Sequence, residues 1–441
     1  MVKLDASQLR YLTRDHFRAL TAVEMGMRNH ELVPRALVYS ISGINNGSSI
    51  NSVLLYLCDK KLLTFERGKR YDGYRLTYSG YDFLALNVLR ARGVISSIGN
   101  QIGVGKESDV YVASNDEGRL FAVKLHRLGR TCFRKVSEKR DYQRKGASHK
   151  AASWIYLSRL AAIREYAFMK LLHERQLLPI PEPVDYNRHA IVMELIDGRL
   201  LNHISREDLV GEDGNEEKIE QLYEKLMAII MKLANEFGVV HGDFNEFNIL
   251  LRNNEGRDPV MIDFPQMVSV GHELGPTYFE RDVGCIVDFF VKRFNFESDS
   301  APAFEALEIS ESTSELKQLA DLLDDEATLL QHIEKEKGGG GDGGKSETLQ
   351  EEEVQQQQTL AEPQDMLSKF LNSLPSSSNH NTNSTDKTGK IEESSPPLYY
   401  EQMNDALIAE AQEKLLLEGG KLAELTLSRE AEERDTFPED H

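Results

Sequence analysis

The chain of 441 residues is long enough for two or three domains, and its 40% content of hydrophobic residues excludes a wholly disordered protein. We expect neither secretion nor membrane insertion, because no signal-type segment and no apolar run of about 18 residues occurs, which leaves the cytoplasm, with shuttling through the nucleus, as the expected location. The net charge of −20 hides an asymmetry: residues 1–180 hold 30 Lys and Arg against 16 Asp and Glu, so a basic first part that suits a polyanionic partner precedes an acidic remainder.

Residues 1–92 are predicted to form a small helical domain with a β-hairpin. Apolar residues recur at helical spacing in the segments Ser7–Met25, Pro34–Ser40, Ser49–Lys61 and 79–87. Residues 62–77 predict two short strands joined by a charged turn. Three helices followed by a basic hairpin resemble a winged helix, with Ser49–Lys61 as the recognition helix. Contacts to nucleic-acid phosphate or sugar would then come from the hairpin residues Arg67, Lys69 and Arg70, and a domain that only docks protein is the alternative.

From residue 93 the pattern changes to short strands separated by turns. Strands are predicted at Ile98–Gly103, Val110–Ser114, Leu120–Leu125 and Ala190–Leu195. Helices are predicted at Ser153–Glu174 and Glu216–Phe237. The first three strands suit an antiparallel sheet that covers a nucleotide, and we divide the domain at residues 93–335 into an N-lobe of 93–196 and a C-lobe of 197–335.

Glycines between the first two of these strands suggest a phosphate-binding turn. The residues expected to contact the nucleotide there are Gly103, Val104, Gly105, Lys106, Ser108 and Val110. Lys124, one strand later, has the place of a kinase lysine that contacts the α- and β-phosphates. Glu165 is the expected partner of Lys124, with Glu174 as the second choice. The backbone of Glu194 and Ile196 is expected to contact adenine.

The stretch from His241 to Phe264 carries the strongest signal for phosphoryl transfer. Asp243 is followed five residues later by Asn248 and fifteen residues after that by Asp263. One carboxylate can orient an attacking hydroxyl or water, while an amide oxygen and a second carboxylate hold Mg²⁺ against the triphosphate. We therefore predict Asp243 as the catalytic base or orienting group, Asn248 and Asp263 as Mg²⁺ ligands, and ATP and Mg²⁺ as cofactors.

These motifs resemble those of the RIO-type atypical protein kinases, and the preceding winged helix is similar to that of the second RIO subfamily. The resemblance is carried by the stretches Gly103–Val110, Ala122–Lys124, His241–Asn248 and Ile262–Gln266. The fold it implies is α+β: a winged helix, a truncated bilobal protein-kinase-like domain and a disordered acidic tail. Truncation agrees with the short sequence between Asp263 and the Gly-rich linker, which lacks an Ala-Pro-Glu motif.

The resemblance also implies a function and partners. RIO proteins are assembly factors of the small ribosomal subunit, so the expected partner is its precursor, with rRNA and ribosomal proteins. It implies that Asp263 becomes an aspartyl phosphate, which makes the protein more an ATPase than a kinase. The segment Arg127–Lys150 is a basic insert expected to be a solvated loop that contacts RNA, through Arg134, Lys135, Lys139 and Arg140, and the resemblance places phosphorylated serines, Ser137 or Ser148, in it.

The last hundred residues have a different composition. Residues 336–399 are rich in Gly, Gln, Ser and acidic residues and are predicted to be a disordered linker. Residues 400–441 regain helical periodicity and are predicted to be an acidic helical tail. Assembly or export factors are its candidate partners, and a marginal helix without a dedicated role is the alternative.

Two other functions remain open. Small-molecule phosphotransferases of the aminoglycoside or choline kinase type have a similar His-Gly-Asp, Asn and Ile-Asp-Phe pattern, but they carry a larger helical substrate lobe. A non-catalytic RNA-binding scaffold with a degenerate kinase fold is the second alternative. Intact Lys124, Asp243, Asn248 and Asp263 argue against it.

Overall fold

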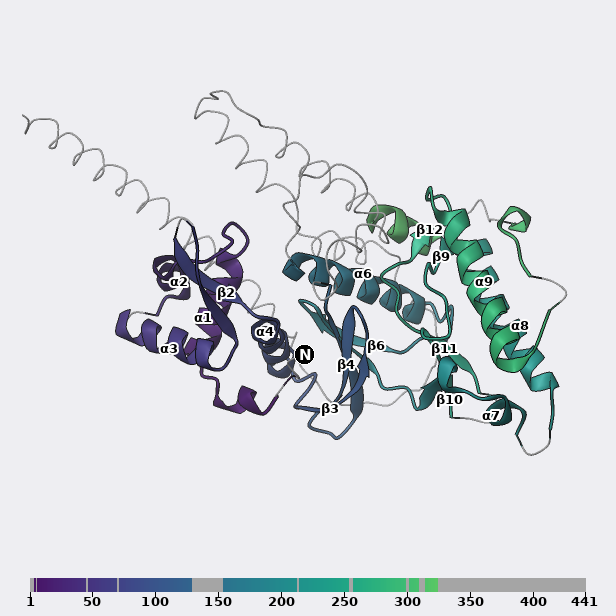
Figure 1. The fold of residues 1–441 in the computed structure, drawn as a ribbon, viewed down its shortest axis with the longest axis horizontal. Helices are drawn as coiled ribbons and strands as arrows, with labels where there is room; N and C mark the ends of the chain where they lie inside the picture. The colour runs from purple at the N-terminus through teal and green to yellow at the C-terminus, as the bar shows by residue number, and fades with distance from the viewer. Residues whose placement is uncertain are drawn as a thin grey trace, which may run out of the picture. The chain divides into compact units, whose positions relative to one another are not determined.

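The computed structural model describes the chain in separate stretches, namely residues 4, 6–44, 47–69, 71–128, 154–211, 214–253, 257–298, 301–308 and 314–323. These residues form two compact units, one ending at Leu84 and the other beginning at Ala85, so the division falls inside a helix (Figure 1). The predicted linker of 336–399 and the predicted tail of 400–441 lie outside the described residues. No helix among the described stretches is long and apolar enough to span a bilayer.

The first unit has the order of elements of a winged helix. Its elements are η1 (Ala6–Tyr11), α1 (Arg14–Gly26), α2 (Arg35–Ser42), α3 (Gly47–Asp59), β1 (Leu63–Arg67), β2 (Asp72–Leu76) and α4 (Tyr78–Ala91), the last of which continues into the second unit. The strands β1 and β2 pair antiparallel, with Leu63 opposite Leu76, and Val33 bridges to Tyr74 at the edge of β2. Fully buried side chains such as Leu54 and Leu57 on α3 form its core.

One predicted helix boundary is wrong. Ser7–Met25 was expected to be a single helix, but the structure has a 3-10 turn that ends at Tyr11 and an α-helix that begins at Arg14. Thr13 between them is extended, with φ −88° and ψ 169°, and its N–H donates to Nδ1 of His16 over 2.9 Å. Threonine is a preferred N-cap residue, so the chain restarts its helix there despite continuous apolar spacing.

The second unit begins with an antiparallel sheet and one long helix. The sheet has the order β3-β4-β5-β7-β6, and its strands are β3 (Ser97–Val104), β4 (Ser108–Ser114), β5 (Leu120–His126), β6 (Pro183–Asn187) and β7 (Ala190–Glu194). Helix α6 (Trp154–Glu174) contacts β5, β6 and β7. Lys124 lies opposite Val110 on one side and Ile191 on the other, so the central strand of the sheet carries it.

The rest of the second unit is mainly helical, with short strand pairs that carry the loops of the site. Its elements are β8 (Gly198–Leu200), η3 (Leu201–His203), α7 (Arg206–Val210), α8 (Glu217–Asn235), β9 (Val239–Val240), β10 (Ile249–Arg252), β11 (Pro259–Met261), β12 (Val268–Ser269), α9 (Gly275–Phe294) and η4 (Phe304–Ala306). Strand β10 lies between β8 and β11, and β9 pairs with β12. Residues 315–323 are also helical.

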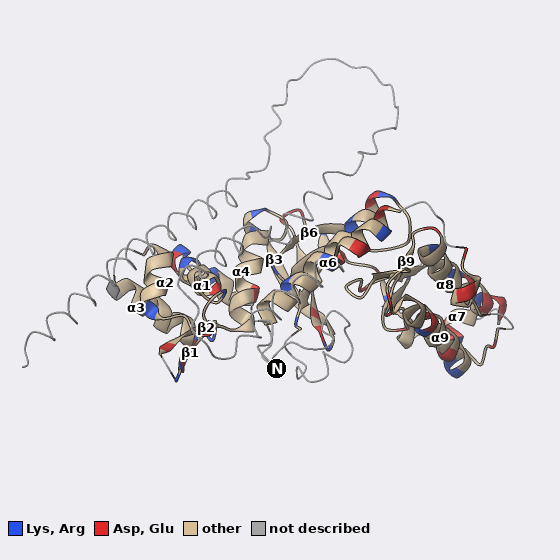
Figure 2. Ribbon diagram, turned by 90° about the horizontal axis from the view of Figure 1, so that it is seen from above, with Lys and Arg blue, Asp and Glu red and all other residues tan. Residues whose placement is uncertain are grey.

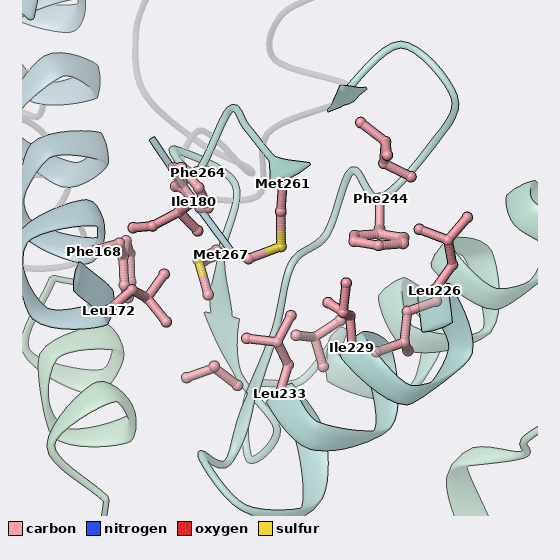
Figure 3. Close-up of a cluster of buried hydrophobic side chains, with 14 of the residues drawn as sticks. Phe168, Leu172, Ile180, Leu226, Ile229, Leu233, Phe244, Met261, Phe264 and Met267 are labelled. Atoms are coloured by element: carbon pink, nitrogen blue, oxygen red, sulfur yellow. The ribbon is translucent and has the colours of Figure 1, made fainter. Parts of the chain in front are cut away.

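A continuous hydrophobic cluster packs against the loops that carry Asp243 and Asp263. Phe168 and Leu172 of α6, Leu226, Ile229 and Leu233 of α8, and Phe244, Met261, Phe264 and Met267 from the loops and β11 all belong to it (Figure 3). Phe244 and Phe264 each follow an aspartate of the predicted site, and both are almost completely buried. Because each phenylalanine is packed in the core, the neighbouring aspartate is held at a fixed place.

Candidate active site

Lys124 joins the two lobes of the second unit through two carboxylates. Its Nζ lies 2.6 Å from Oε1 of Glu165 on α6 and 2.7 Å from Oδ1 of Asp263, which follows β11. Glu165, rather than Glu174, is therefore the partner of the lysine, as the sequence predicts, and Glu174 lies 3.8 Å from Lys170 instead. Lys124 and Glu165 are buried, whereas the Asp263 side chain is 35% exposed. Solvent, and hence a ligand, can reach this end of the cluster.

The charges of the cluster stabilise one another. Burial alone would lower the pKa of Lys124, but Asp263 and Glu165 outweigh it and raise the pKa to about 12. Burial would raise the pKa of both carboxyls, yet Lys124 lowers that of Asp263 to about 2 and, with His126, also lowers that of Glu165. All three groups are therefore charged at neutral pH, which is the state needed to bind phosphate and a metal ion.

Asp243 is surrounded by side-chain amides. Nδ2 of Asn245 donates to its Oδ1 over 3.1 Å, and Nδ2 of Asn248 and Nε2 of Gln266 donate to its Oδ2 over 3.0 and 3.3 Å. The Asn248 amide nitrogen is thus oriented toward Asp243. The sequence predicts no role for Asn245 or Gln266, because only the folded loop brings these amides to Asp243.

A backbone contact brings the two predicted metal ligands together. The Ile262 N–H donates to the Asn248 carbonyl over 3.0 Å, so the residue before Asp263 is bonded to Asn248. Since the Asn248 amide nitrogen is used by Asp243, its side-chain oxygen is the atom left to bind a metal ion. An amide oxygen and a carboxylate match the oxygen ligands that Mg²⁺ prefers, with the remaining positions taken by water and phosphate. The donor set therefore fits Mg²⁺.

Backbone strain occurs at both predicted catalytic loops. Gly242 has φ +78°, and a Cβ there would lie 2.6 Å from the Gln266 carbonyl oxygen, so only glycine fits before Asp243. Asp263 has φ +70°, which is unusual for a residue with a side chain. Such strain persists only where the surroundings enforce it, and here it directs the Asp263 side chain to Lys124.

The buried Asp282 of α9 holds the loop around Asp243. Its Oδ2 and Oδ1 accept hydrogen bonds from the backbone N–H groups of Gly242 and Phe244, over 2.8 and 2.9 Å. Burial raises the pKa of Asp282 to about 7, although these two hydrogen bonds oppose the shift. Asp282 is not among the site residues predicted from the sequence. The available signal was a lone acid between Phe279, Val283 and Ile286 on the apolar face of a helix.

We expect Asp282→Asn to destabilise the protein more at pH 5 than at pH 8. An amide can accept only one of the two hydrogen bonds well, which costs on the order of 2 kcal/mol. The raised pKa of Asp282 means that its contribution to stability is present below its unfolded pKa of about 4 and is lost as the pH rises through 7. The wild type therefore loses this contribution between pH 5 and 8, whereas Asp282→Asn has none to lose.

The measurement is the free energy of unfolding from urea titrations at the two pH values. Asp288→Asn makes the same chemical change at an exposed position of α9 and is the matched control. A difference between wild type and Asp282→Asn that does not change with pH would contradict the raised pKa.

His241, just before this loop, is buried and neutral. Burial lowers its pKa to about 4, and its Nδ1 accepts a hydrogen bond from the Asp243 N–H over 3.3 Å. The ring also lies against Phe244 and Phe264, with centroids 5.7 Å apart in both pairs. His241 is therefore part of the packing that shapes the loop.

The predicted phosphate-binding residues lie at the tip of the β3–β4 hairpin. Gly103 and Val104 end β3, Ser108 begins β4, and the Gly105 N–H donates to the Ser108 carbonyl over 2.8 Å. Lys106 is exposed in the turn, and Val110 packs against the core. The structure thus places Gly103 to Ser108 at the tip of one hairpin, whereas Val110 lies within β4 opposite Lys124.

One prediction is wrong for a residue that packs beside the tip of this hairpin. Arg127 was expected at the start of a solvated basic loop, but it is only 4% exposed, and its Nε donates to Oδ2 of Asp109 over 3.1 Å. Asp109 also accepts from Nε2 of Gln101 over 3.1 Å. A buried carboxylate needs such partners, so Arg127 is a structural residue of the sheet. The rest of the predicted insert, residues 129–150, lies outside the described residues.

The segment expected to contact adenine begins at the last residue of β7. The Glu194 N–H donates to the Glu182 carbonyl over 2.8 Å, so a contact of Glu194 with a base would come from its carbonyl group. Its side chain pairs with Arg252 of β10 at 3.1 Å. Ile196 is buried two residues further on. This segment is therefore bonded to strands of both lobes.

Only two of the residues predicted to contact nucleic acid lie in the described stretches. Arg67 and Lys69 are exposed at the end of the β1–β2 hairpin, while Arg70 lies outside the described residues. Arg134, Lys135, Lys139 and Arg140 are also outside them. Figure 2 shows Lys and Arg interspersed with Asp and Glu on helices such as α8 and α9. Eight Lys and Arg against two acids fall in residues 129–153, so a large share of the basic excess belongs to that segment.

Comparisons with known proteins agree with this fold and site. A two-lobed domain with a lysine, a glutamate and an aspartate in this arrangement is typical of protein kinases. Residues 109–302 match the RIO domain. Residues 9–92 match the Rio2 N-terminal domain. The chain belongs to the Rio2 family of RIO proteins.

Individual relatives match about three quarters of this chain. It is 48% identical over 316 residues to serine/threonine-protein kinase rio2 of Schizosaccharomyces pombe, covering 72% of this chain and 87% of that protein. It is 48% identical over 346 residues to serine/threonine-protein kinase RIO2 of Caenorhabditis elegans, covering 76% of this chain but 62% of that protein.

A crystal structure of a Rio2 kinase from Chaetomium thermophilum, in complex with ADP and Mg²⁺ and with a phosphoaspartate, has a similar fold. Its TM-score is 0.63 at 37% sequence identity, covering 76% of this chain and all of that one.

The match to the Dictyostelium discoideum relative covers only 55% of that protein, so this chain spans less than two thirds of two of its curated relatives.

Proposed function

We propose that the protein binds MgATP and catalyses transfer of its γ-phosphoryl group, as an atypical serine/threonine kinase or as an ATPase. The observation that carries this proposal is the Lys124 ammonium held between Glu165 and Asp263, next to a loop in which Asn248 and Gln266 fix Asp243. A cation, a metal-binding carboxylate and an oriented carboxylate are the groups that phosphoryl transfer requires.

Each residue has a role in this mechanism. Lys124 contacts the α- and β-phosphates, and the β3–β4 turn supplies backbone N–H groups to them. When bound, Mg²⁺ neutralises charge on the phosphates, and Asn248 and Asp263 would hold it. Asp243 orients the attacking hydroxyl or water. The hydrogen bonds from Asn245, Asn248 and Gln266 fix the direction of its carboxylate, so little reorganisation is needed during the reaction.

Asp263 is also proposed as the acceptor of the phosphoryl group. A carboxylate oxygen of Asp263 would attack the γ-phosphorus, ADP would leave, and water would later hydrolyse the aspartyl phosphate. The similar Rio2 kinase structure that contains ADP, Mg²⁺ and a phosphoaspartate supports this assignment. Partial exposure of the Asp263 side chain leaves room for such an approach.

The proposed partner is a precursor of the small ribosomal subunit, in the cytoplasm and in transit through the nucleus. Support comes from membership of the Rio2 family and from the basic residues 1–180, because counterion release from phosphate drives binding to RNA. The winged helix would dock the protein on rRNA or ribosomal proteins, and the tail would bind assembly or export factors.

Charge reversal of the hairpin tests the RNA contact. We expect Arg67→Glu with Lys69→Glu to weaken RNA binding and to reduce the slope of log affinity against log salt by about 1.5, since each lost phosphate contact removes roughly 0.7–0.9 from it. ATP turnover should stay unchanged. Measured binding to small-subunit rRNA fragments with an unaltered salt slope would remove the hairpin from the interface.

The class of reaction is tested by following γ-labelled ATP. Appearance of label as inorganic phosphate, or on protein serine or threonine, supports an ATPase or a kinase. Label transferred to choline or an aminoglycoside would instead favour a small-molecule phosphotransferase. Binding of MgATP without release of label would favour the scaffold.

A further inference from the structure

His126 is a buried histidine beside the Lys124–Glu165 pair. It lies two residues after Lys124 on β5, so both side chains leave the strand on the same face. Its Nε2 is 2.7 Å from Oε2 of Glu165, while Lys124 binds the other oxygen, Oε1. The side chains of His126 and Glu165 are 3% and 1% exposed. One buried carboxylate is thus shared between the lysine and the histidine.

The direction of this hydrogen bond follows from the charges. The pKa of Glu165 is lowered despite its burial, because Lys124 and His126 favour the carboxylate. A carboxylate only accepts hydrogen bonds, so the Nε2 of His126 must carry the proton and donate it. This bond satisfies the second oxygen of Glu165, which burial separates from water.

Nucleotide binding would change the contacts of Lys124. In this structure Lys124 has two carboxylate partners, Glu165 and Asp263. A metal ion held by Asp263 would take one of them away, and Glu165 alone would then hold the lysine at the phosphates. The carboxylate of Glu165 ends a flexible side chain on α6, and the bond from His126 restrains its second oxygen.

We propose that His126 is a positioning residue for ATP, acting through Glu165 to keep Lys124 at the phosphates. The inference rests on the proposed function, since it concerns the same nucleotide site. It assigns a second donor to the glutamate of the lysine–glutamate pair. Its effect should appear in nucleotide affinity more than in the rate of the chemical step, because Lys124 contacts phosphates that do not move.

Three substitutions separate a donor from a packing residue. His126→Leu fills the space without donating, and His126→Asn is polar but too short to reach Glu165. Both should raise the dissociation constant of MgATP about tenfold, the effect expected for one lost hydrogen bond to a buried charge. His126→Gln places an amide N–H near the original Nε2 and should stay within about threefold of the wild type.

The matched control is Leu157→Ala. Leu157 lies on α6 with Glu165 and is buried, but it packs in a separate hydrophobic cluster with Leu128 and Ala161, apart from the cluster under the site loops. It should lower the melting temperature while leaving the dissociation constant within about twofold, since a cavity in the core acts on stability. If the His126 variants lost affinity only because they are less stable, this control should lose affinity as well.

A double-mutant cycle with Glu165→Ala gives the decisive result. Dissociation constants are measured by calorimetry on the full chain, together with the melting temperature of each variant. If His126 acts through Glu165, His126→Leu should change affinity by less than about twofold in the Glu165→Ala background. Equal effects in both backgrounds, or failure of His126→Gln to restore affinity, would overturn the proposal. A wild-type chain that does not bind MgATP would overturn the proposed function itself.

Discussion

Asp263→Asn is expected to reduce MgATP turnover by on the order of 10³-fold or more, because it removes a charged metal ligand and the nucleophile together. The amide can still accept a hydrogen bond from Lys124, whose bond to Glu165 is unchanged. The fold should therefore persist. Phosphate release is measured at saturating MgATP, and covalent label on the chain is measured in parallel after acid quenching.

The control is Asp258→Asn, which makes the same change just before β11. Asp258 pairs with Lys225 over 2.9 Å on the surface and does not contact the site. Its turnover should equal that of the wild type. If Asp263→Asn retained wild-type turnover, neither the metal site nor the aspartyl phosphate could involve Asp263.

Lys124→Met is expected to abolish productive ATP binding and also to change how stability depends on pH. Breaking a buried ion pair costs about 3 kcal/mol or more, because Glu165 keeps a buried charge without its cation. In the wild type, Lys124 holds the pKa values of Glu165 and Asp263 below their usual range. Without it, burial and mutual repulsion should raise both values.

The sign of the pH effect differs between the two proteins. In the wild type the contribution of these carboxylates is present above their unfolded pKa of about 4 and is lost as the pH falls toward 2. In Lys124→Met the raised pKa values mean that stability is gained on acidification from pH 7 to 5. The gap in unfolding free energy should therefore shrink over that range.

Lys124→Arg separates the two effects of this substitution. It keeps the positive charge and should preserve most of the stability, but its planar guanidinium does not reproduce the point charge of an ammonium and should weaken ATP binding. Urea titrations at pH 5, 6 and 7 test the prediction. A constant gap between wild type and Lys124→Met would show that Lys124 does not control these carboxyl groups.

Local signals predict the helices and hairpin of the first unit, the strands β3, β4, β5 and β7, the helices α6 and α8, and the central residues of the site. The sequence analysis did not predict β6, the short strands β8 to β12, or the helices α7 and α9. Glycines between strands, a lysine one strand later and the spacing of Asp243, Asn248 and Asp263 are readable from the sequence, and the structure brings Lys124, Glu165 and Asp263 together. The paired strands are likewise close to their predicted limits. These features depend on residue type and spacing within short segments.

The roles of Asp282 and His126 depend on contacts with residues that are distant in the sequence. Asp282 lies 40 residues from Gly242 along the chain, and His126 lies 39 from Glu165. The apolar face of α9 indicates that Asp282 is buried but not which groups it binds, and nothing local distinguishes His126 from a packing histidine. The error at Ser7–Met25 has another cause, since Thr13 begins a new helix by a cap that apolar periodicity does not reveal.

The most direct test of the proposed function compares Mg²⁺-dependent phosphate release by the wild type and by Asp243→Asn, with and without purified small-subunit precursors. Asn is similar in shape to Asp but removes the charge that orients the attacking group. We predict that turnover falls by on the order of 10²-fold or more in the variant, whereas MgATP affinity changes little. Equal turnover by the two proteins would contradict catalysis at this site.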